Sequence, residues 1–231
     1  MNRREAASLL GSLLLAACGG GSGLDATPEA SGSASLRTPP TPDLALWGDS
    51  MVPPLARALS QLQPGRQVFD GGVDGETSMQ VLERLRAAQP ALRDRITIFW
   101  FGHNNFRQSG PAAAARIKSD LAAAVASLAP GNDDFVVLAL VNDAGAAPAG
   151  TAEHDAVVRL NQDLAAAYPL HFLDIRRFMV DQADPATAQG ASDLRNDVPA
   201  STLRADSIHL NGFGADVLAR RIQVLLQDFG W

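Results

Sequence analysis

The sequence predicts an α/β protein, a three-layer α/β/α sandwich with a mainly parallel sheet of five strands. Three observations support this prediction. Short apolar segments alternate with helical patterns throughout residues 43–231. These segments are apolar on both faces, which is typical of buried parallel strands. Gly, Asn or Asp follows each of them, so each strand is expected to end in a turn. Alternation of this kind places helices on both sides of a sheet.

The five strands are expected at short apolar segments, namely 44–47, 67–69, 96–101, 135–141 and 171–173. Segments of this length fit strands better than helices. One sequence does not determine which strands are neighbours in the sheet. For the order of the five strands we expect the flavodoxin-like arrangement.

Five helical patterns follow these strands in turn, near 52–62, 77–88, 112–128, 152–167 and 212–228. The first carries Pro53 and Pro54 in its first turn, where proline is well tolerated. The last has a broad apolar stripe on one face, and Asn211 just before it is a suitable N-cap. These patterns predict amphipathic helices that pack against the sheet.

The N-terminal residues 1–17 read as a secretory signal peptide. Arg3 and Arg4 precede an apolar stretch that is too short to span a bilayer and ends in small residues before Cys18. Cys18 at this position resembles the lipobox of bacterial lipoproteins. The resemblance implies that Cys18 is acylated and that the protein is exported and lipid-anchored in the cell envelope. Two alternatives stay open: an unmodified Cys18 in a cleaved signal, and twin-arginine rather than Sec export.

Residues 18–42 then comprise the lipidated cysteine and a linker rich in Gly, Ser, Ala, Thr and Pro, which is expected to be flexible. Residues 43–231 have the length of one domain. Cys18 is the only cysteine, so no intramolecular disulfide can form. The net charge of −6 argues against nucleic acid as a partner. Membrane contact is expected through the N-terminal lipid only, and the oligomeric state is left open.

Polar residues follow the first three predicted strands and occur again near the C-terminus. Gly48-Asp49-Ser50 follows the first strand, 70–77 the second and Gly102-His103-Asn104-Asn105 the third, while Asp206 and His209 lie late in the chain. Because the carboxyl ends of parallel strands meet at one edge of a sheet, these side chains are expected to converge. A hydroxyl, an imidazole and a carboxylate are the parts of a nucleophilic acyl-transfer site.

On these motifs the chain resembles the SGNH hydrolases, also called the GDSL esterase/lipase family, over nearly the whole domain. Gly48-Asp49-Ser50 is similar to the first block of the family, and 70–77 to the second, with Asp70 in place of the usual Asn. Residues 102–105 are similar to the third block, with Asn105 in place of the usual Asp. Asp206-x-x-His209 matches the last block.

The resemblance implies the SGNH hydrolase fold and a set of site residues. Ser50 is the expected nucleophile, His209 the base and Asp206 the acid that orients it. The oxyanion hole is expected from the N–H groups of Ser50 and Gly72 and the side-chain amide of Asn104. Asp206, three residues before His209, can reach the second ring nitrogen and stabilise the imidazolium that forms.

The function expected is that of a serine esterase, an enzyme that hydrolyses carboxylic esters of a small molecule or glycan through an acyl-enzyme. O-acetyl groups on envelope or extracellular glycans are the expected substrate. Two alternatives stay open: acyl transfer to a sugar hydroxyl, and a non-catalytic glycan-binding module on a hydrolase scaffold.

Several residues also have a purely structural interpretation. Ser50 can act as a helix cap, and Gly72 and Asn104 can be ordinary turn residues. His103 is expected to line the pocket, and Asn142-Asp143 and the polar segment 181–205 to shape its rim, the latter as a lid. No histidine or cysteine cluster has the spacing of metal ligands. No metal or other cofactor is expected.

Overall fold

The structure is a computed structural model that describes residues 43–231. The predicted signal peptide, Cys18 and most of the linker lie outside the described residues. Within the described part of the chain, no helix combines the length and the apolar character needed to cross a membrane.

A five-stranded sheet forms the centre of the domain, and all of its strand pairs are parallel. The strand order is β2-β1-β3-β4-β5, which confirms the predicted flavodoxin-like arrangement. The strands are β1 (Leu44–Gly48), β2 (Val68–Gly72), β3 (Ile96–Trp100), β4 (Phe135–Leu138) and β5 (Phe172–Leu173). In this register Gly48 lies between Gly72 and Trp100, so the segments that follow β1, β2 and β3 leave the sheet side by side.

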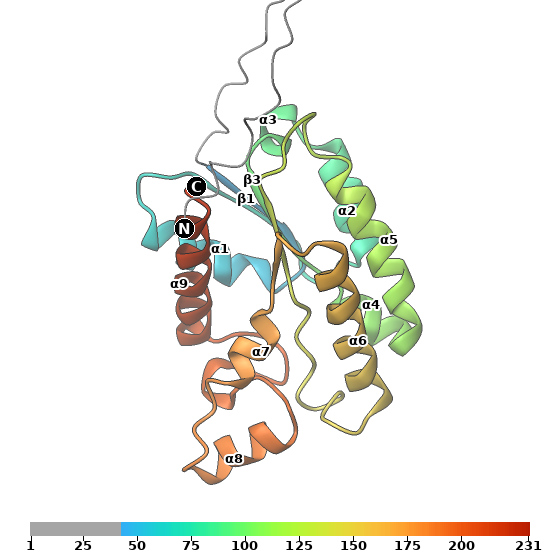
Figure 1. The fold of residues 1–231 in the computed structure, drawn as a ribbon, viewed down its shortest axis with the longest axis vertical. Helices are drawn as coiled ribbons and strands as arrows, with labels where there is room; N and C mark the ends of the chain where they lie inside the picture. Colours follow the sequence, from blue (N-terminus) through green and yellow to red (C-terminus); the bar gives the residue numbers. More distant parts are fainter. Residues whose placement is uncertain (1–42) are drawn as a thin grey trace, which may run out of the picture. The chain divides into compact units, whose positions relative to one another are not determined.

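Helices cover both faces of the sheet (Figure 1). The α-helices are α1 (Val52–Leu62), α2 (Ser78–Ala87), α3 (Pro90–Arg93), α4 (His103–Ser109), α5 (Ala113–Val125), α6 (Ala152–Ala167), α7 (Ile175–Val180), α8 (Ala188–Arg195) and α9 (Gly212–Asp228). The five predicted helices are confirmed as α1, α2, α5, α6 and α9. The predicted cap is also present, because the Asn211 side chain accepts a hydrogen bond from the N–H of Gly214.

Two hydrophobic cores lie on opposite faces of the sheet. Leu46 and Ile98 belong to the core beneath α1 and α9, whereas Trp47 and Phe99 belong to the core beneath α2, α5 and α6. Successive residues of a strand point to opposite faces. Both faces of β1 and β3 are therefore buried, which explains why their residues are apolar except for the buried Thr97.

The segment 181–205 differs from the predicted polar loop. It contains α8 and the short 3₁₀ turn Ser201–Leu203, and Val198, Ala200 and Leu203 in it are buried. Asp193 is also buried and accepts a hydrogen bond from the N–H of Ser201. These contacts make the segment part of the folded body.

Candidate active site

Ser50 lies in the tight turn between β1 and α1. A Cβ on Gly48 would come within 1.9 Å of the carbonyl oxygen of Trp100, so this position requires glycine. Asp49 is fully buried, and its Oδ1 accepts the N–H of Met51 at 3.1 Å. The close packing at Gly48 and the hydrogen bond of Asp49 thus fix the conformation of the turn. The turn presents Ser50 at the carboxyl edge of the sheet.

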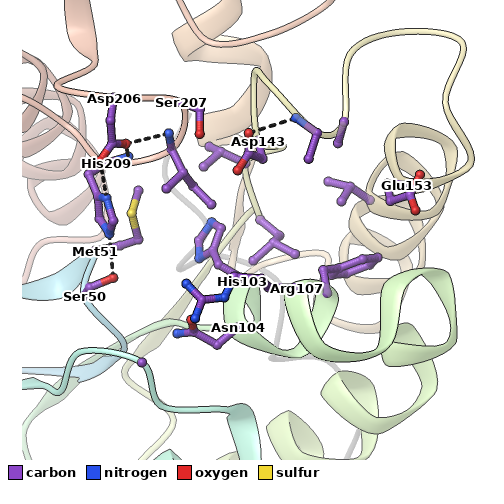
Figure 2. A pocket seen from close by; sticks show the side chains of 18 of the residues that line it. Ser50, Met51, His103, Asn104, Arg107, Asp143, Glu153, Asp206, Ser207 and His209 are labelled. Atoms are coloured by element: carbon purple, nitrogen blue, oxygen red, sulfur yellow. Dashed lines mark hydrogen bonds and ion pairs between the residues drawn. The ribbon is translucent and has the colours of Figure 1, made fainter.

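Ser50, His209 and Asp206 form a continuous hydrogen-bonded chain (Figure 2). Ser50 Oγ lies 2.9 Å from His209 Nε2, and His209 Nδ1 lies 2.8 Å from Asp206 Oδ2. Asp206 Oδ1 also accepts the N–H groups of Ile208 at 2.8 Å and His209 at 2.7 Å. The structure therefore brings together the three residues that the sequence selected.

The charge on Asp206 determines the tautomer of His209. Desolvation acts to raise the pKa of Asp206, but the hydrogen bonds from Ile208 and His209 outweigh it and lower this pKa to about 2. A charged carboxylate can only accept hydrogen bonds, so His209 Nδ1 must be the donor. His209 Nε2 is then free to accept the proton of the Ser50 hydroxyl.

Asn104 lies in the first turn of α4, with its side chain largely buried at the pocket. Its Nδ2 donates to the carbonyl oxygen of Glu76 at 3.0 Å, which leaves the second amide hydrogen for a ligand. The next residue, Asn105, has a structural role. Its Oδ1 accepts the N–H of Ser78 at 2.8 Å and its Nδ2 donates to Ser78 Oγ, so it ties α4 to the start of α2.

The contacts of Gly72 do not support its predicted role as a donor in the oxyanion hole. Its N–H donates to Asp70 Oδ1 at 3.0 Å, and a Cβ there would lie 2.5 Å from Pro53 Cδ, so Gly72 serves close packing against α1. Gly72 does not line the pocket, whereas Gly75 does. Gly75 has a φ of +80°, and its N–H makes no hydrogen bond within residues 43–231. The sequence pattern contains both glycines, and only the turn geometry distinguishes them.

The site opens into a cavity of about 550 Å³. Ser50, His209, Asn104 and Gly75 line it, together with Asp206, Ser207, Ile208, Met51, Asp74, His103, Phe106, Arg107, Leu140, Val141, Asp143, Ala146, Ala147, Glu153 and Val157. No residue of 181–205 lines this cavity. The segment therefore does not form the predicted lid. Of the predicted rim pair, Asp143 lines the cavity and Asn142 is buried behind it. The apolar wall residues Leu140 and Val141 after β4 and Val157 on α6 were not predicted, since in sequence they read as core.

His103 lines the pocket as expected, and it also makes a contact that was not predicted from the sequence. Its Nδ1 lies 3.3 Å from Asp49 Oδ2, and its Nε2 is buried with no partner within residues 43–231. Because Asp49 precedes Ser50 and His103 precedes Asn104, this pair connects the turn of the serine with the turn of the asparagine. The sequence held one signal for this contact, because Asp49 and His103 are each adjacent to a predicted site residue in a separate motif.

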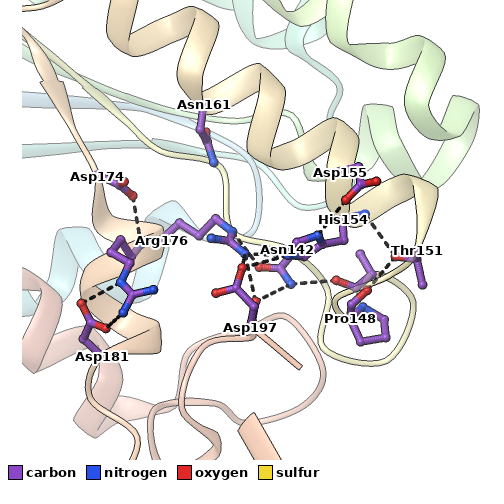
Figure 3. A network of polar contacts seen from close by, with 12 residues as sticks. Asn142, Pro148, Thr151, His154, Asp155, Asn161, Asp174, Arg176, Asp181 and Asp197 are labelled. Carbon is purple, nitrogen blue, oxygen red and sulfur yellow. Dashed lines mark hydrogen bonds and ion pairs between the residues drawn. The ribbon is translucent and has the colours of Figure 1, made fainter. Parts of the chain in front are cut away.

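A second polar network lies behind the pocket wall (Figure 3). Arg176 Nε donates to Asn142 Oδ1 at 3.0 Å, and Asp197 Oδ2 lies 2.5 Å from Arg176 Nη2 and 2.9 Å from His154 Nε2. Burial acts to raise the pKa of Asp197, but the hydrogen bonds from Arg176 and His154 outweigh it and lower this pKa. Asn142 also donates to the carbonyl oxygen of Ala147, which lines the cavity. The network therefore supports the wall of the pocket.

No group of three or more His, Cys, Asp or Glu side chains in residues 43–231 is arranged to hold a metal ion. A parallel α/β domain with a Ser–His–Asp chain at its carboxyl edge defines a class, the hydrolases that use a serine nucleophile. The model of the GDSL-like Lipase/Acylhydrolase family matches residues 32–217, and the chain belongs to this family.

Solved structures share the fold at low sequence identity. The lipase/acylhydrolase from Enterococcus faecalis is 19% identical with a TM-score of 0.59, over 80% of this chain and 95% of that chain. The acetyl xylan esterase AlAXEase is 12% identical with a TM-score of 0.62, over 80% and 99%. The psychrotrophic esterase EstA from Pseudoalteromonas sp. is 16% identical with a TM-score of 0.58, over 81% and 98%. Among curated proteins none matches the sequence significantly.

Proposed function

We propose that this protein is a serine esterase that works through an acyl-enzyme on Ser50. As Ser50 Oγ attacks the ester carbonyl carbon, His209 Nε2 takes the hydroxyl proton and Asp206 stabilises the imidazolium. His209 then gives this proton to the leaving alcohol oxygen, and the acyl group stays on Ser50. A water molecule activated by His209 hydrolyses the acyl-enzyme and releases the acid. The observation that carries the proposal is the 2.9 Å contact between Ser50 Oγ and His209 Nε2.

The tetrahedral intermediate needs donors aimed at its oxyanion. We assign these to the N–H of Ser50, the free amide hydrogen of Asn104 and the N–H of Gly75. Gly75 takes the place expected for Gly72, because the Gly72 N–H already donates to Asp70. The N–H of Ser50 makes no hydrogen bond within residues 43–231 and is available in the same way.

Two alternative functions for this site are acyl transfer to a sugar hydroxyl and non-catalytic glycan binding. Acyl transfer to a sugar hydroxyl would use the same acyl-enzyme and differ only in the acceptor. A glycan-binding module would have no need of the Ser50–His209–Asp206 chain, whose hydrogen bonds favour catalysis. Hydrolysis of O-acetyl groups on glycans stays a prediction, since none of the described contacts identifies a sugar.

The cellular localisation of the protein is a separate proposal that rests on the sequence alone. We propose export and a lipid anchor on Cys18, on the strength of the signal-like residues 1–17 and the lipobox resemblance. In a bacterial host, the full chain should partition with membranes and Cys18→Ala should not. Equal partitioning of the two would contradict the anchor without affecting the proposed activity.

Labelling with a fluorophosphonate probe tests the proposed activity. The protein should be labelled on Ser50 and should hydrolyse a short p-nitrophenyl ester, and Ser50→Ala should lose both properties. Ser60→Ala is the matched control, because Ser60 is exposed on α1 and lies outside the cavity. Retention of labelling and hydrolysis in Ser50→Ala would refute the proposal.

A further inference from the structure

We propose that the ion pair between Arg84 and Glu76 positions the donors of the oxyanion hole, which makes Arg84 a positioning residue for the reaction at Ser50. This inference rests on the proposed function and adds to it a residue that lies outside the motifs selected from the sequence. Arg84 lies on α2 and does not line the cavity. We therefore expect it to affect the reaction through the groups that it contacts.

The Arg84 guanidinium joins three segments of the chain at the carboxyl edge of the sheet. Its Nε donates to both carboxylate oxygens of Glu76, at 2.9 and 2.7 Å, and its Nη2 lies 2.6 Å from Glu76 Oε2. Nη2 also donates to the carbonyl oxygens of Gly71 at 2.9 Å and Gly48 at 3.2 Å. The guanidinium carbon lies 5.6 Å from the ring centroid of Trp47. Arginine suits this position, since its planar fork presents several donors in a fixed geometry.

Glu76 connects the ion pair to two of the three proposed oxyanion donors. Gly75 comes directly before it in the chain. The N–H of Glu76 donates to the carbonyl oxygen of Val73 at 3.3 Å, which closes the turn around Gly75. The carbonyl oxygen of Glu76 accepts the hydrogen bond from Asn104 Nδ2 at 3.0 Å. The orientations of the Gly75 N–H and of the Asn104 amide therefore both depend on the position of the Glu76 backbone.

The same guanidinium contacts the turn that supplies the third donor, the N–H of Ser50. The carbonyl oxygen of Gly48, two residues before Ser50, accepts hydrogen bonds from Arg84 Nη2 and from the N–H of Val73, both at 3.2 Å. This carbonyl group links the turn of the serine to the turn around Gly75. One side chain thus contacts, directly or through one further hydrogen bond, each segment that supplies an oxyanion donor.

The contribution of Arg84 to catalysis should come from preorganisation. Oxyanion donors are effective when they already point at the place where negative charge develops. The side chains of Arg84 and Glu76 are only 30% and 14% exposed. Loss of Arg84 would leave a largely buried carboxylate without its partner, so the turn would have to move to hydrate it. A displacement of about 1 Å in such a group can cost about 100-fold in rate.

Kinetics of Arg84→Met in the full chain test the proposal. Methionine keeps an unbranched stem and removes the guanidinium. We expect kcat for a p-nitrophenyl ester to fall about 10–100-fold and KM to change less than about threefold, because the oxyanion forms only in the transition state. Arg86→Met is the matched control, since Arg86 is exposed on the same helix, and it should leave kcat unchanged. A folded Arg84→Met variant with a normal kcat, or with a change confined to KM, would overturn the inference.

A double-mutant cycle distinguishes positioning of the donors from a general effect on the fold. If Arg84 acts through Asn104, its loss should matter less once that side chain has been removed. Arg84→Met should lower kcat by a factor at least about threefold smaller in the Asn104→Ala background than in the wild type. Equal factors in the two backgrounds would overturn the inference.

Glu76→Gln tests the other half of the ion pair and does not depend on the folding of Arg84→Met. It removes the charge and keeps an acceptor for Arg84 Nε, so kcat should fall at least about threefold, but less than in Arg84→Met. Glu83→Gln, at an exposed carboxylate on α2, should leave kcat unchanged. Thermal melts establish that each variant is folded.

The outcomes for Glu76→Gln separate this inference from the proposed function. A folded Glu76→Gln variant with a normal kcat would overturn the inference, whatever the fate of Arg84→Met. Failure of both variants to fold would assign the ion pair to stability alone and would overturn it as well. A wild-type protein that neither hydrolyses the ester nor reacts with the fluorophosphonate probe would instead count against the proposed function.

Discussion

Ser50 Oγ and His209 Nε2 lie 2.9 Å apart although 159 positions separate the two residues in the chain. The packing of α1 against α9 on one face of the sheet accounts for this proximity, since Ser50 precedes α1 and His209 precedes α9. Asn211 fixes the start of α9, because its side chain donates to the carbonyl oxygens of Thr202 and Arg204 and accepts the N–H of Gly214. The core of the fold thus sets the distance between nucleophile and base.

Asn104→Ala tests the side-chain donor of the proposed oxyanion hole. Loss of one such donor typically costs about 3–4 kcal/mol of transition-state stabilisation, so kcat should fall about 10²–10³-fold. The KM should change little, because the oxyanion forms only in the transition state. Steady-state kinetics on a p-nitrophenyl ester provides the measurement. A variant with a normal kcat would remove Asn104 from the mechanism.

Gly75 and Gly72 are predicted to differ in what their substitution damages. Gly75→Ala meets no neighbouring atom but places a side chain at a φ of +80°, so it should disturb the turn and its N–H and lower kcat at least tenfold. Gly72→Ala would force a Cβ to within 2.5 Å of Pro53 Cδ and should mainly lower the melting temperature. Kinetics and thermal melts of both variants distinguish the two roles. The reverse pattern would restore Gly72 as the donor.

The charge of Asp206 should persist over the working pH range and should be needed for activity. With a pKa of about 2, Asp206 stays charged over the working pH range, so acidification within that range should not lower activity through protonation of Asp206. Asp206→Asn removes the charge that stabilises the imidazolium, and kcat should fall about 10³–10⁴-fold. Asp216→Asn, at an exposed carboxylate on α9, is the control. A normal kcat in Asp206→Asn would argue against this role of the Asp206 charge.

Asp197 should contribute to stability in a pH-dependent way. Its pKa is lowered in the folded protein, so its contribution is present above the unfolded pKa of about 3.9 and is lost as pH falls through the lower folded value. Asp197→Asn should cost about 1–3 kcal/mol near pH 7 and lower the melting temperature by about 2–4 °C per kcal/mol. This difference should shrink below about pH 4. Asp155→Asn is the control, because Asp155 contacts the same His154 from an exposed position. Equal melting temperatures of wild type and Asp197→Asn at pH 7 would contradict this role.

The regular elements of the fold could be predicted from the sequence because both faces of the sheet are buried. The strand Ile96–Trp100 has no polar face, and α9 has a clear apolar stripe with a cap, so local patterns were sufficient. The segment 181–205 was misread for the opposite reason. Its anchors are single buried residues such as Val198 and Leu203, which form no periodic pattern.

The candidate site was predicted in part for similar physical reasons. Ser50, Asp206 and His209 could be selected because each is a reactive group in a short motif at a predicted turn. The role of Gly72 could not be read in the same way, since it depends on whether its N–H is already bonded. The walls of the cavity, such as Val157, required the packing of α6 against the end of β4, which no local pattern shows.

Trapping of the acyl-enzyme tests the central claim most directly. The protein is mixed with an excess of a p-nitrophenyl ester, quenched in acid within the burst of p-nitrophenol release, digested and analysed by mass spectrometry. The account predicts that the peptide containing Ser50 gains the mass of the acyl group, with the modification on Ser50 itself, and that Ser50→Ala shows no gain. Rapid ester turnover with no acylated Ser50, or with the acyl group on another residue, would contradict the account.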